Sequence, residues 1–372
     1  MKKETLEQMK IDDITQQVLH NCQISDARHA GLYSVCGLAL RLRDLFKWEK
    51  DLDPWVERKS SEVLDWIGTK EKKWDEIAEK DYTDIVILGR NYDPFDTKTI
   101  NTLLEPHGLF YGAGYAHSLK PTFFLATIED KSKVSGYPVY TLGRELARDL
   151  LTIPALSQDS FILLRKESAK LFLWDQLLYI KKSGRQALSF ALENSGVKDQ
   201  HPKALQRHLA TIFAAQRETY IYHEIGEIKD EVFDRKIWRE FIAAYPHTAV
   251  ELLARAVKDL LADTNGYGTL RYFIKKRKTA SLAFYVAFFD GLAKALFPEL
   301  ATSFRQFYHA HNWRVIENAV SLGYQTAKQY AEEIITIYKA GKQKKNKNWA
   351  KNEIEKRLLD RVNSSSNVSS TN

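Results

Sequence analysis

The spacing of hydrophobic and polar positions changes twice along the chain and predicts three successive parts. In residues 4–80 the apolar side chains have helical spacing, most clearly between residues 32 and 45. Ser25 or Asp26 is expected to cap this helix, because their side-chain oxygens can accept the free N–H groups of a first turn. Residues 83–166 contain short apolar runs that end at turn residues, which is typical of strands. From residue 168 to 340 apolar residues recur at i, i+3 and i+4, so only helices are expected there.

The middle part is expected to form a small, mostly antiparallel sheet. Strands are predicted at residues 85–88, 123–128, 139–142 and 161–164, and a helix at residues 144–151. The second and third of these strands are expected to form a hairpin with a long polar loop, and the connections are too short for parallel βαβ units. The sequence therefore predicts an α+β fold. Residues 1–167 combine a helical N-terminal segment (4–80) with the sheet (83–166), and residues 168–340 form an all-helical domain.

Composition indicates a globular chain of 372 residues, 44% hydrophobic and 28% charged. The two cysteines, Cys22 and Cys36, are too few for a disulfide-stabilised scaffold. The first residues contain no apolar signal-peptide region, and the apolar run at 282–289 is far shorter than the roughly 20 residues that span a bilayer. We therefore expect a cytoplasmic protein with reduced thiols and no transmembrane segment.

The net charge of +7 is concentrated near the C-terminus. Residues 339–361 contain nine basic and three acidic residues and so account for nearly all of it. Residues 341–372 are predicted to form a basic, largely disordered tail in which residues 350–362 could form a short helix. Removal of residues 342–372 is expected to leave the fold intact. Such a tail suits salt-sensitive contact with an acidic protein, RNA or an anionic surface, or it serves only solubility. Its candidate contact residues are Lys342, Lys344, Lys345, Lys347 and Lys351.

The first candidate site lies within residues 218–227, in a long helical segment. His223, Glu224 and Glu227 can project from neighbouring positions of one helix side. Imidazoles and carboxylates inside a helical bundle are the ligands of di-iron and di-manganese sites, so Fe, Mn or Zn is the expected metal. Asp290, which interrupts an apolar run, is the preferred additional ligand. Other acids and histidines of the helical domain could contribute, namely His247, Glu251, Asp263, His309 and His311.

The same residues also fit a structural role without a metal. In that alternative His223 bonds a neighbouring carboxylate on a half-exposed helix, and Asp290 pairs with Lys294 four residues later. In either case we expect His223 and Glu227 to point into the helical domain, with at least one of them hydrogen-bonded to another helix. Gly226 is expected to leave room for a close neighbouring helix, since glycine costs about 1 kcal/mol in a helix interior.

A second candidate cluster lies near the N-terminus, and its spacing matches no common zinc pattern. Thiolate and imidazole together would suit zinc. The alternative is that Asp26 caps a helix, Arg28 or His29 bonds a nearby acid, and both cysteines are packed as small hydrophobic residues. The residues of this cluster are His20, Cys22, Asp26, His29 and Cys36.

Known catalytic signatures are missing from the sequence. It contains no G-x-S-x-G and no G-x-x-x-x-G-K-[ST] pattern, and Gly112 and Gly114 are better explained as turns between strands. A non-enzymatic binding or assembly protein is therefore the first hypothesis. The alternative is a metal-dependent enzyme, either a non-haem iron or manganese oxidoreductase or a hydrolase, that uses the site at residues 218–227.

Several segments together resemble a known family. They include HNCQISDARHAG at residues 20–31, YDPFD at 92–96, YGAGY at 111–115 and HEIGE at 223–227. These segments resemble an uncharacterised bacterial family, a domain of unknown function, which is associated with sulfate-reducing and related anaerobes. The resemblance runs from about residue 15 to 310. It implies a bacterial cytoplasmic protein of unassigned activity and supplies no catalytic residues.

Overall fold

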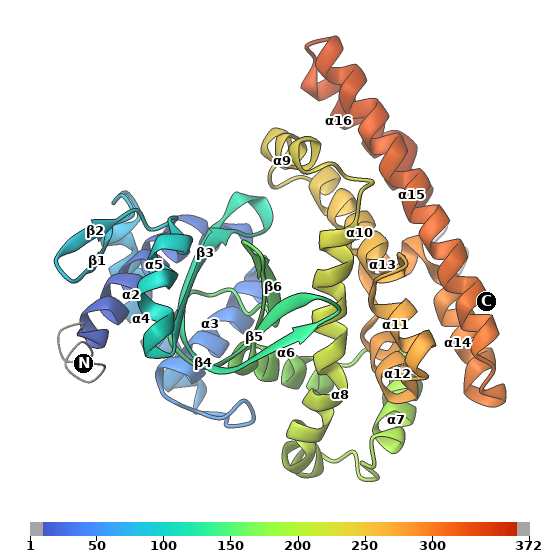
Figure 1. The fold of residues 1–372 in the computed structure, drawn as a ribbon, viewed down its shortest axis with the longest axis horizontal. Helices are drawn as coiled ribbons and strands as arrows, with labels where there is room; N and C mark the ends of the chain where they lie inside the picture. Colours follow the sequence, from blue (N-terminus) through green and yellow to red (C-terminus); the bar gives the residue numbers. More distant parts are fainter. Residues whose placement is uncertain (1–9, 363–372) are drawn as a thin grey trace. The chain divides into compact units, whose positions relative to one another are not determined.

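The structure is a computed structural model that describes residues 10–362. The chain divides into two compact units, Met1–Asp175 and Gln176–Asn372. The sequence placed this boundary at residues 167/168, whereas the division falls inside helix α6 (Lys166–Leu178), which follows the last strand without a loop. The fold is α+β, with the strands in the first unit and helices throughout the second (Figure 1).

Among the described residues, four α-helices belong to the first unit alone, and the first of them differs from the prediction. They are α2 (Ile11–His29), α3 (Val35–Glu49), α4 (Ser60–Ile77) and α5 (Thr97–Leu104). The predicted cap at Ser25 or Asp26 is wrong, because both residues lie inside α2 and are buried. Their side chains bond other segments instead: Ser25 donates to the carbonyl of Pro121, and Asp26 accepts from the N–H of Leu150. The cap of α3 is Ser34, whose hydroxyl accepts from the N–H of Gly37.

The strands form two sheets. β1 (Ile85–Ile87) and β2 (Arg90–Tyr92) make a short antiparallel pair. The larger sheet has the order β3-β4-β5-β7-β6, and only its β5–β7 pair is parallel. The bounds of its strands are β3 Leu109–Tyr115, β4 Pro121–Val134, β5 Tyr137–Arg148, β6 Ala155–Gln158 and β7 Phe161–Arg165.

Two local predictions in this sheet are wrong because the backbone pairing between β4 and β5 extends further than the residue pattern indicates. The polar stretch after residue 128 is not a loop, because it pairs with β5 up to the register of Val134 with Tyr137. The turn is only two residues long, and both Ser135 (φ 49°) and Gly136 (φ 92°) adopt the left-handed conformation of a tight hairpin. The predicted helix at 144–151 is instead the end of β5, where Ala147 pairs with Leu125. Its helical spacing is overridden because β4 supplies hydrogen-bond partners to this backbone.

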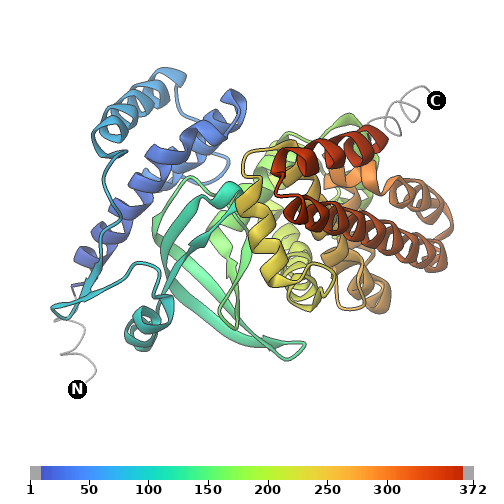
Figure 2. The same cartoon turned by 90° about the horizontal axis from the view of Figure 1, so that it is seen from above.

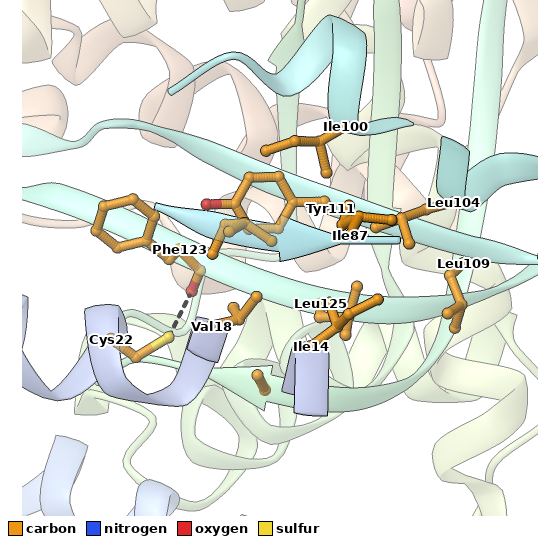
Figure 3. Close-up of a cluster of buried hydrophobic side chains, with 12 residues drawn as sticks. Ile14, Val18, Cys22, Ile87, Ile100, Leu104, Leu109, Tyr111, Phe123 and Leu125 are labelled. Atoms are coloured by element: carbon orange, nitrogen blue, oxygen red, sulfur yellow. Dashed lines mark hydrogen bonds between the residues drawn. The ribbon is translucent and has the colours of Figure 1, made fainter. Parts of the chain in front are cut away.

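Helix α2 packs on the larger sheet through a shared core (Figure 3). Ile14, Val18 and Cys22 lie one turn apart on α2 and face Phe123 and Leu125 of β4. The thiol of Cys22 donates to the carbonyl oxygen of Phe123 at 3.2 Å. The thiol of Cys22, one of the two considered as zinc ligands, therefore lies in the core of the first unit.

The second unit is built only of helices over its described residues, as predicted (Figure 1). None of the described helices is both long enough and apolar enough to cross a membrane. The helices that follow α6 are α7 (Arg185–Asn194), α8 (Pro202–Lys229), α9 (Arg235–Ala244), α10 (Ala249–Thr264), α11 (Thr269–Lys276), α12 (Thr279–Phe288), α13 (Gly291–Leu296), α14 (Pro298–Ala310), α15 (Trp313–Gln343) and α16 (Lys347–Ile354).

The prediction of a largely disordered tail is wrong for residues 341–362, of which the sequence indicated a short helix only at 350–362. Helix α15 continues to Gln343, and α16 then folds back along it, followed by a π-helical turn at Glu355–Leu359 (Figure 2). The apolar side chains recur every four residues and are buried, which explains why this charged segment folds. They are Ala350, Ile354, Leu358 and Val362. Residues 363–372 of the predicted tail lie outside the described residues.

Candidate metal centre

Helices α8 and α10 come into backbone contact at Gly226, as the sequence predicted. A methyl group at this position would lie 2.0 Å from the carbonyl oxygen of Ala262, so only glycine permits this approach. Helix α10 is capped by Thr248, whose hydroxyl accepts from the N–H of Glu251. The close approach allows side chains of α10 to reach His223 and Glu227 on α8.

Three possible metal ligands meet between these helices. One ligand atom each from His223, Glu227 and Asp259 can be chosen so that all three atoms lie within 4.8 Å of one another. The Nδ1 atom of His223 lies 3.0 Å from Oδ1 of Asp263, and its Nε2 atom lies 4.0 Å from Oε1 of Glu227. Nδ1 is therefore engaged by a carboxylate while Nε2 faces the other donors. Metal-binding histidines have this arrangement, because the carboxylate fixes the ring and its tautomer.

The carboxylate that orients His223 is itself held in place. Tyr285 of α12 donates its hydroxyl to Oδ2 of Asp263 at 2.7 Å. Burial, followed by the charge of Asp263, raises the pKa of Tyr285 well above its ordinary value, so this phenol keeps its proton. Three helices thus fix one imidazole through a chain of two hydrogen bonds.

Two positive charges already balance the carboxylates of this group. Burial opposes protonation of His223, but the nearby carboxylates, Asp263 first, outweigh burial and hold its pKa well above the ordinary value. The ammonium of Lys258 lies 2.7 Å from Oε1 of Glu227. Burial by itself would raise the pKa of Glu227, yet the charges of Lys258 and His223 hold the pKa of this carboxyl below its ordinary value. The local field attracts cations, and a metal would replace the proton of His223.

The structure brings together only part of the first predicted site. The expected hydrogen bond from His223 or Glu227 to another helix is confirmed by the contacts with Asp263 and Lys258. Asp263 was among the additional acids considered. Asp259, Lys258 and Tyr285 were missed, although the spacing of Asp259 and Asp263 by four residues in an apolar helix was a usable signal.

Glu224 and Asp290 do not join this donor group. Glu224 is buried one position beyond His223 on α8. Asp290 is not a buried acid, because it caps the start of α13 and its side chain is 45% exposed. It pairs with Lys181 at 2.5 Å rather than with Lys294, whose ammonium bonds the hydroxyl of Ser183.

The second predicted cluster does not converge on a common point. Cys22 is buried, and burial raises the pKa of its thiol, whereas Cys36 is exposed. His20 is half-buried, with a pKa lowered by burial, and His29 bonds the carbonyl of Ser25. Asp26 is 3.1 Å from the ammonium of Lys120. Among residues 10–362 these side chains form no group of three possible metal ligands. Packing explains Cys22, whereas the expectation that Cys36 is also packed is wrong.

Asp26 instead belongs to a buried ion cluster that the sequence did not reveal. The ammonium of Lys120 lies 2.9 Å from Asp149, 3.1 Å from Asp26 and 3.1 Å from the hydroxyl of Ser25. Burial, with a contribution from Asp149, raises the pKa of Asp26 to about 7, although Lys120 opposes this shift. These side chains are at most 2% exposed, so the cluster joins α2 to the sheet and is closed to a substrate.

The fold therefore consists of an α+β unit with a sealed ionic core and a helical unit with a candidate metal centre. The chain belongs to the family of unknown function DUF6866. The model of the family's N-terminal domain matches residues 13–165, and the model of its C-terminal domain matches residues 170–357. The second match includes α16. The family region therefore extends into the basic C-terminal segment, beyond about residue 310, where the resemblance seen in the sequence ends. No curated protein and no solved structure matches the chain.

Proposed function

We propose that the helical unit binds one divalent transition metal between α8 and α10. The ligands are Nε2 of His223 and the carboxylates of Glu227 and Asp259. The observation that carries this proposal is the convergence of three donor atoms within 4.8 Å around an imidazole whose other nitrogen is held by Asp263.

The distances suit a metal of ordinary size. Ligand atoms bound at roughly 2.0–2.2 Å from one ion can be at most about 4.4 Å apart. The separation of 4.0 Å between His223 and Glu227 already satisfies this limit. The other separations are within 4.8 Å, so rotation of the exposed Asp259 side chain is enough to bring its carboxylate to a common ion. One imidazole and two carboxylates favour Mn²⁺, Fe²⁺ or Zn²⁺ over Cu⁺, which prefers sulfur ligands.

The position of Lys258 supports exchange of one cation for another. Its ammonium pairs with Glu227 and also lies 5.4 Å from the centre of the Trp238 ring. A metal that binds Glu227 displaces this ammonium, and the face of Trp238 offers it a second favourable position. The carboxylate can then turn to the metal without leaving a buried lysine unpaired.

Three protein ligands leave coordination positions open for water or substrate. Catalytic zinc sites and non-haem iron sites share this property, whereas structural zinc sites are closed by four protein ligands. We therefore favour a metal-dependent enzyme, a hydrolase or an oxidoreductase, over a metal that serves folding only. The exposed, unpaired thiol of Cys36 supports a reducing, cytoplasmic location.

Metal titration of the full chain tests the proposal. The protein is stripped with EDTA, dialysed, and titrated with Mn²⁺, Fe²⁺ (without oxygen) and Zn²⁺ by isothermal calorimetry, with bound metal counted by mass spectrometry. We expect one equivalent of at least one metal. Asp259→Asn should weaken its affinity at least 10-fold, while Glu231→Gln, which changes an exposed carboxylate beyond α8, should not. Absence of stoichiometric metal, or equal affinity in the Asp259→Asn variant, contradicts the proposal.

A further inference from the structure

A basic cleft lies between α9 and the end of α15, apart from the candidate metal centre. It has a volume of about 380 Å³, and its lining includes Lys236, Glu240, Tyr338, Lys339 and Lys342. The first two come from α9 and the others from α15, so the fold assembles it from segments about 100 residues apart. We infer that this cleft binds the phosphodiester backbone of a single-stranded nucleic acid.

Ion pairs concentrate the C-terminal charge at this cleft. At the far end of the basic segment, Arg357 and Arg361 both pair with Glu333, and Lys351 pairs with Glu355. The lining of the cleft contains three lysines and one acid, and the segments that supply it, α9 and the end of α15 with the chain that follows, carry exposed bases with no acidic partner among the described residues. These exposed bases are Arg235, Lys236, Arg239, Lys339, Lys344, Lys345 and Lys347.

The cleft is held together by contacts within the helical unit. The ring of Tyr338 packs against Phe241 and Tyr245, with ring centres 5.4 and 6.1 Å apart. The hydroxyl of Tyr245 donates to the carbonyl of Lys347 at 3.3 Å, and Lys342 pairs with Glu240 at 2.6 Å. The bases are therefore presented on packed helices and on the short turn that joins α15 to α16, which reduces the entropy lost when a chain of phosphates binds.

The surroundings of the cleft favour a nucleic acid over a membrane. Among the described residues, no large exposed hydrophobic side chain lies in α9 or in residues 336–351, so nothing there could insert between lipids. The ammonium of Lys344 lies 3.5 Å from the ring centre of Trp349, so a base that stacks on this face takes the place of the ammonium, which can then contact a phosphate.

Fluorescence anisotropy with the full chain in EDTA tests the inference independently of any metal. The probe is a labelled 20-nucleotide oligouridylate, measured between 50 and 200 mM KCl. Four phosphate contacts predict a slope of log affinity against log salt of about −3, which is a roughly 50-fold loss over this range. The triple variant Lys236→Gln/Lys339→Gln/Lys345→Gln should weaken binding at least 10-fold and reduce the slope by about 2.

The matched control removes the same charge elsewhere on the helical unit. Lys198→Gln/Lys275→Gln/Lys276→Gln changes three exposed lysines outside the cleft and should leave binding unchanged. Equal weakening by both triple variants, or no binding of oligouridylate, overturns the inference. So does preferential, cleft-dependent binding to vesicles with 30% anionic lipid. An oligothymidylate of equal length distinguishes RNA from DNA, and cleft-dependent binding of either supports the site.

Discussion

At the scale of single residues, Lys120 has the largest expected effect on stability. It is fully buried between the carboxylates of Asp26 and Asp149. Lys120→Met leaves two buried acids without their cation and should lower the free energy of unfolding by about 3–5 kcal/mol, measured by urea denaturation. Adding Asp26→Asn should recover part of this loss, because one of the unpaired charges is then absent. A single variant within about 1 kcal/mol of wild type would contradict this role.

The pKa of Asp26 gives the first unit a specific dependence on pH. The value is about 7 in the folded chain and about 3.9 in an unfolded one, so the folded state binds more protons between these values. Stability conferred by Asp26 should therefore fall by about 1–3 kcal/mol as pH rises from 4 to 7. The charged groups facing it are Lys120 and Asp149, and the pKa of Asp149 is lowered, so its own effect lies at still lower pH.

Comparison of wild type with Asp26→Asn isolates this effect from other titrating groups. The difference in the free energy of unfolding between the two proteins should change from pH 4 to about pH 8 and be constant above it, because Asp26 is still partly protonated in the folded protein at pH 7. A constant difference across the whole range would show that Asp26 is already ionised in the folded protein at pH 4.

The sequence allowed prediction of which side chains share one face of a helix, but it did not allow prediction of which residues of other helices they contact. The relation of His223 to Glu227 follows from a spacing of four residues, which the sequence displays. The contacts with Lys258 and Tyr285 depend on how α8 packs against α10 and α12, which no local pattern encodes. Lys120 could not be recognised as buried, because its two acids lie 94 and 29 residues away in the sequence.

At the scale of helices, Gly226 sets the distance between α8 and α10. Gly226→Ala places a methyl group 2.0 Å from the carbonyl of Ala262 and should destabilise the helical unit by about 2–3 kcal/mol in thermal or urea unfolding. The forced separation should also weaken metal binding. Gly68→Ala is the control, because Gly68 lies inside α4 with no other atom within 4 Å of the added methyl. That variant should gain about 0.5–1 kcal/mol, and equal behaviour of the two would refute the close contact.

The C-terminal helices should contribute to stability despite their charge. Leu358→Ala removes a fully buried side chain and should cost about 2–5 kcal/mol, whereas Asn352→Ala on the exposed side of α16 should change stability by less than about 0.5 kcal/mol. Denaturant unfolding measures both. Deletion of residues 342–372 is accordingly expected to destabilise the protein, contrary to the expectation from composition. An Leu358→Ala protein as stable as wild type would restore the view of a dispensable tail.

Charge and periodicity give opposite indications in this C-terminal segment. The nine bases of residues 339–361 suggested solvation, yet apolar residues at 350, 354, 358 and 362 recur at a helical interval. The hairpin itself is predicted, but its extension through residues 129–134 is hidden for a related reason. Residues 129–134 are mostly exposed on both faces of β4, so they lack the alternation by which a half-buried strand is recognised.

At the scale of the whole molecule, each unit has its own buried core and is expected to fold alone. Fragments 1–178 and 179–372, cut after α6, should each unfold cooperatively on heating, and the second should bind metal with the affinity of the full chain. Calorimetry and metal titration of both fragments check this. A second fragment without a cooperative transition would show that its core depends on the first unit.

The burial of Cys22 provides a kinetic probe of the first unit. Both cysteines of the chain are in that unit, and Cys36 is exposed while Cys22 is 1% exposed with its thiol bonded to Phe123. A thiol reagent at neutral pH should modify Cys36 at once, and Cys22 only during moments when α2 opens from the sheet. After Cys36→Ser, the rate of Cys22 modification in the intact chain reports how often this opening occurs, with no signal from the helical unit.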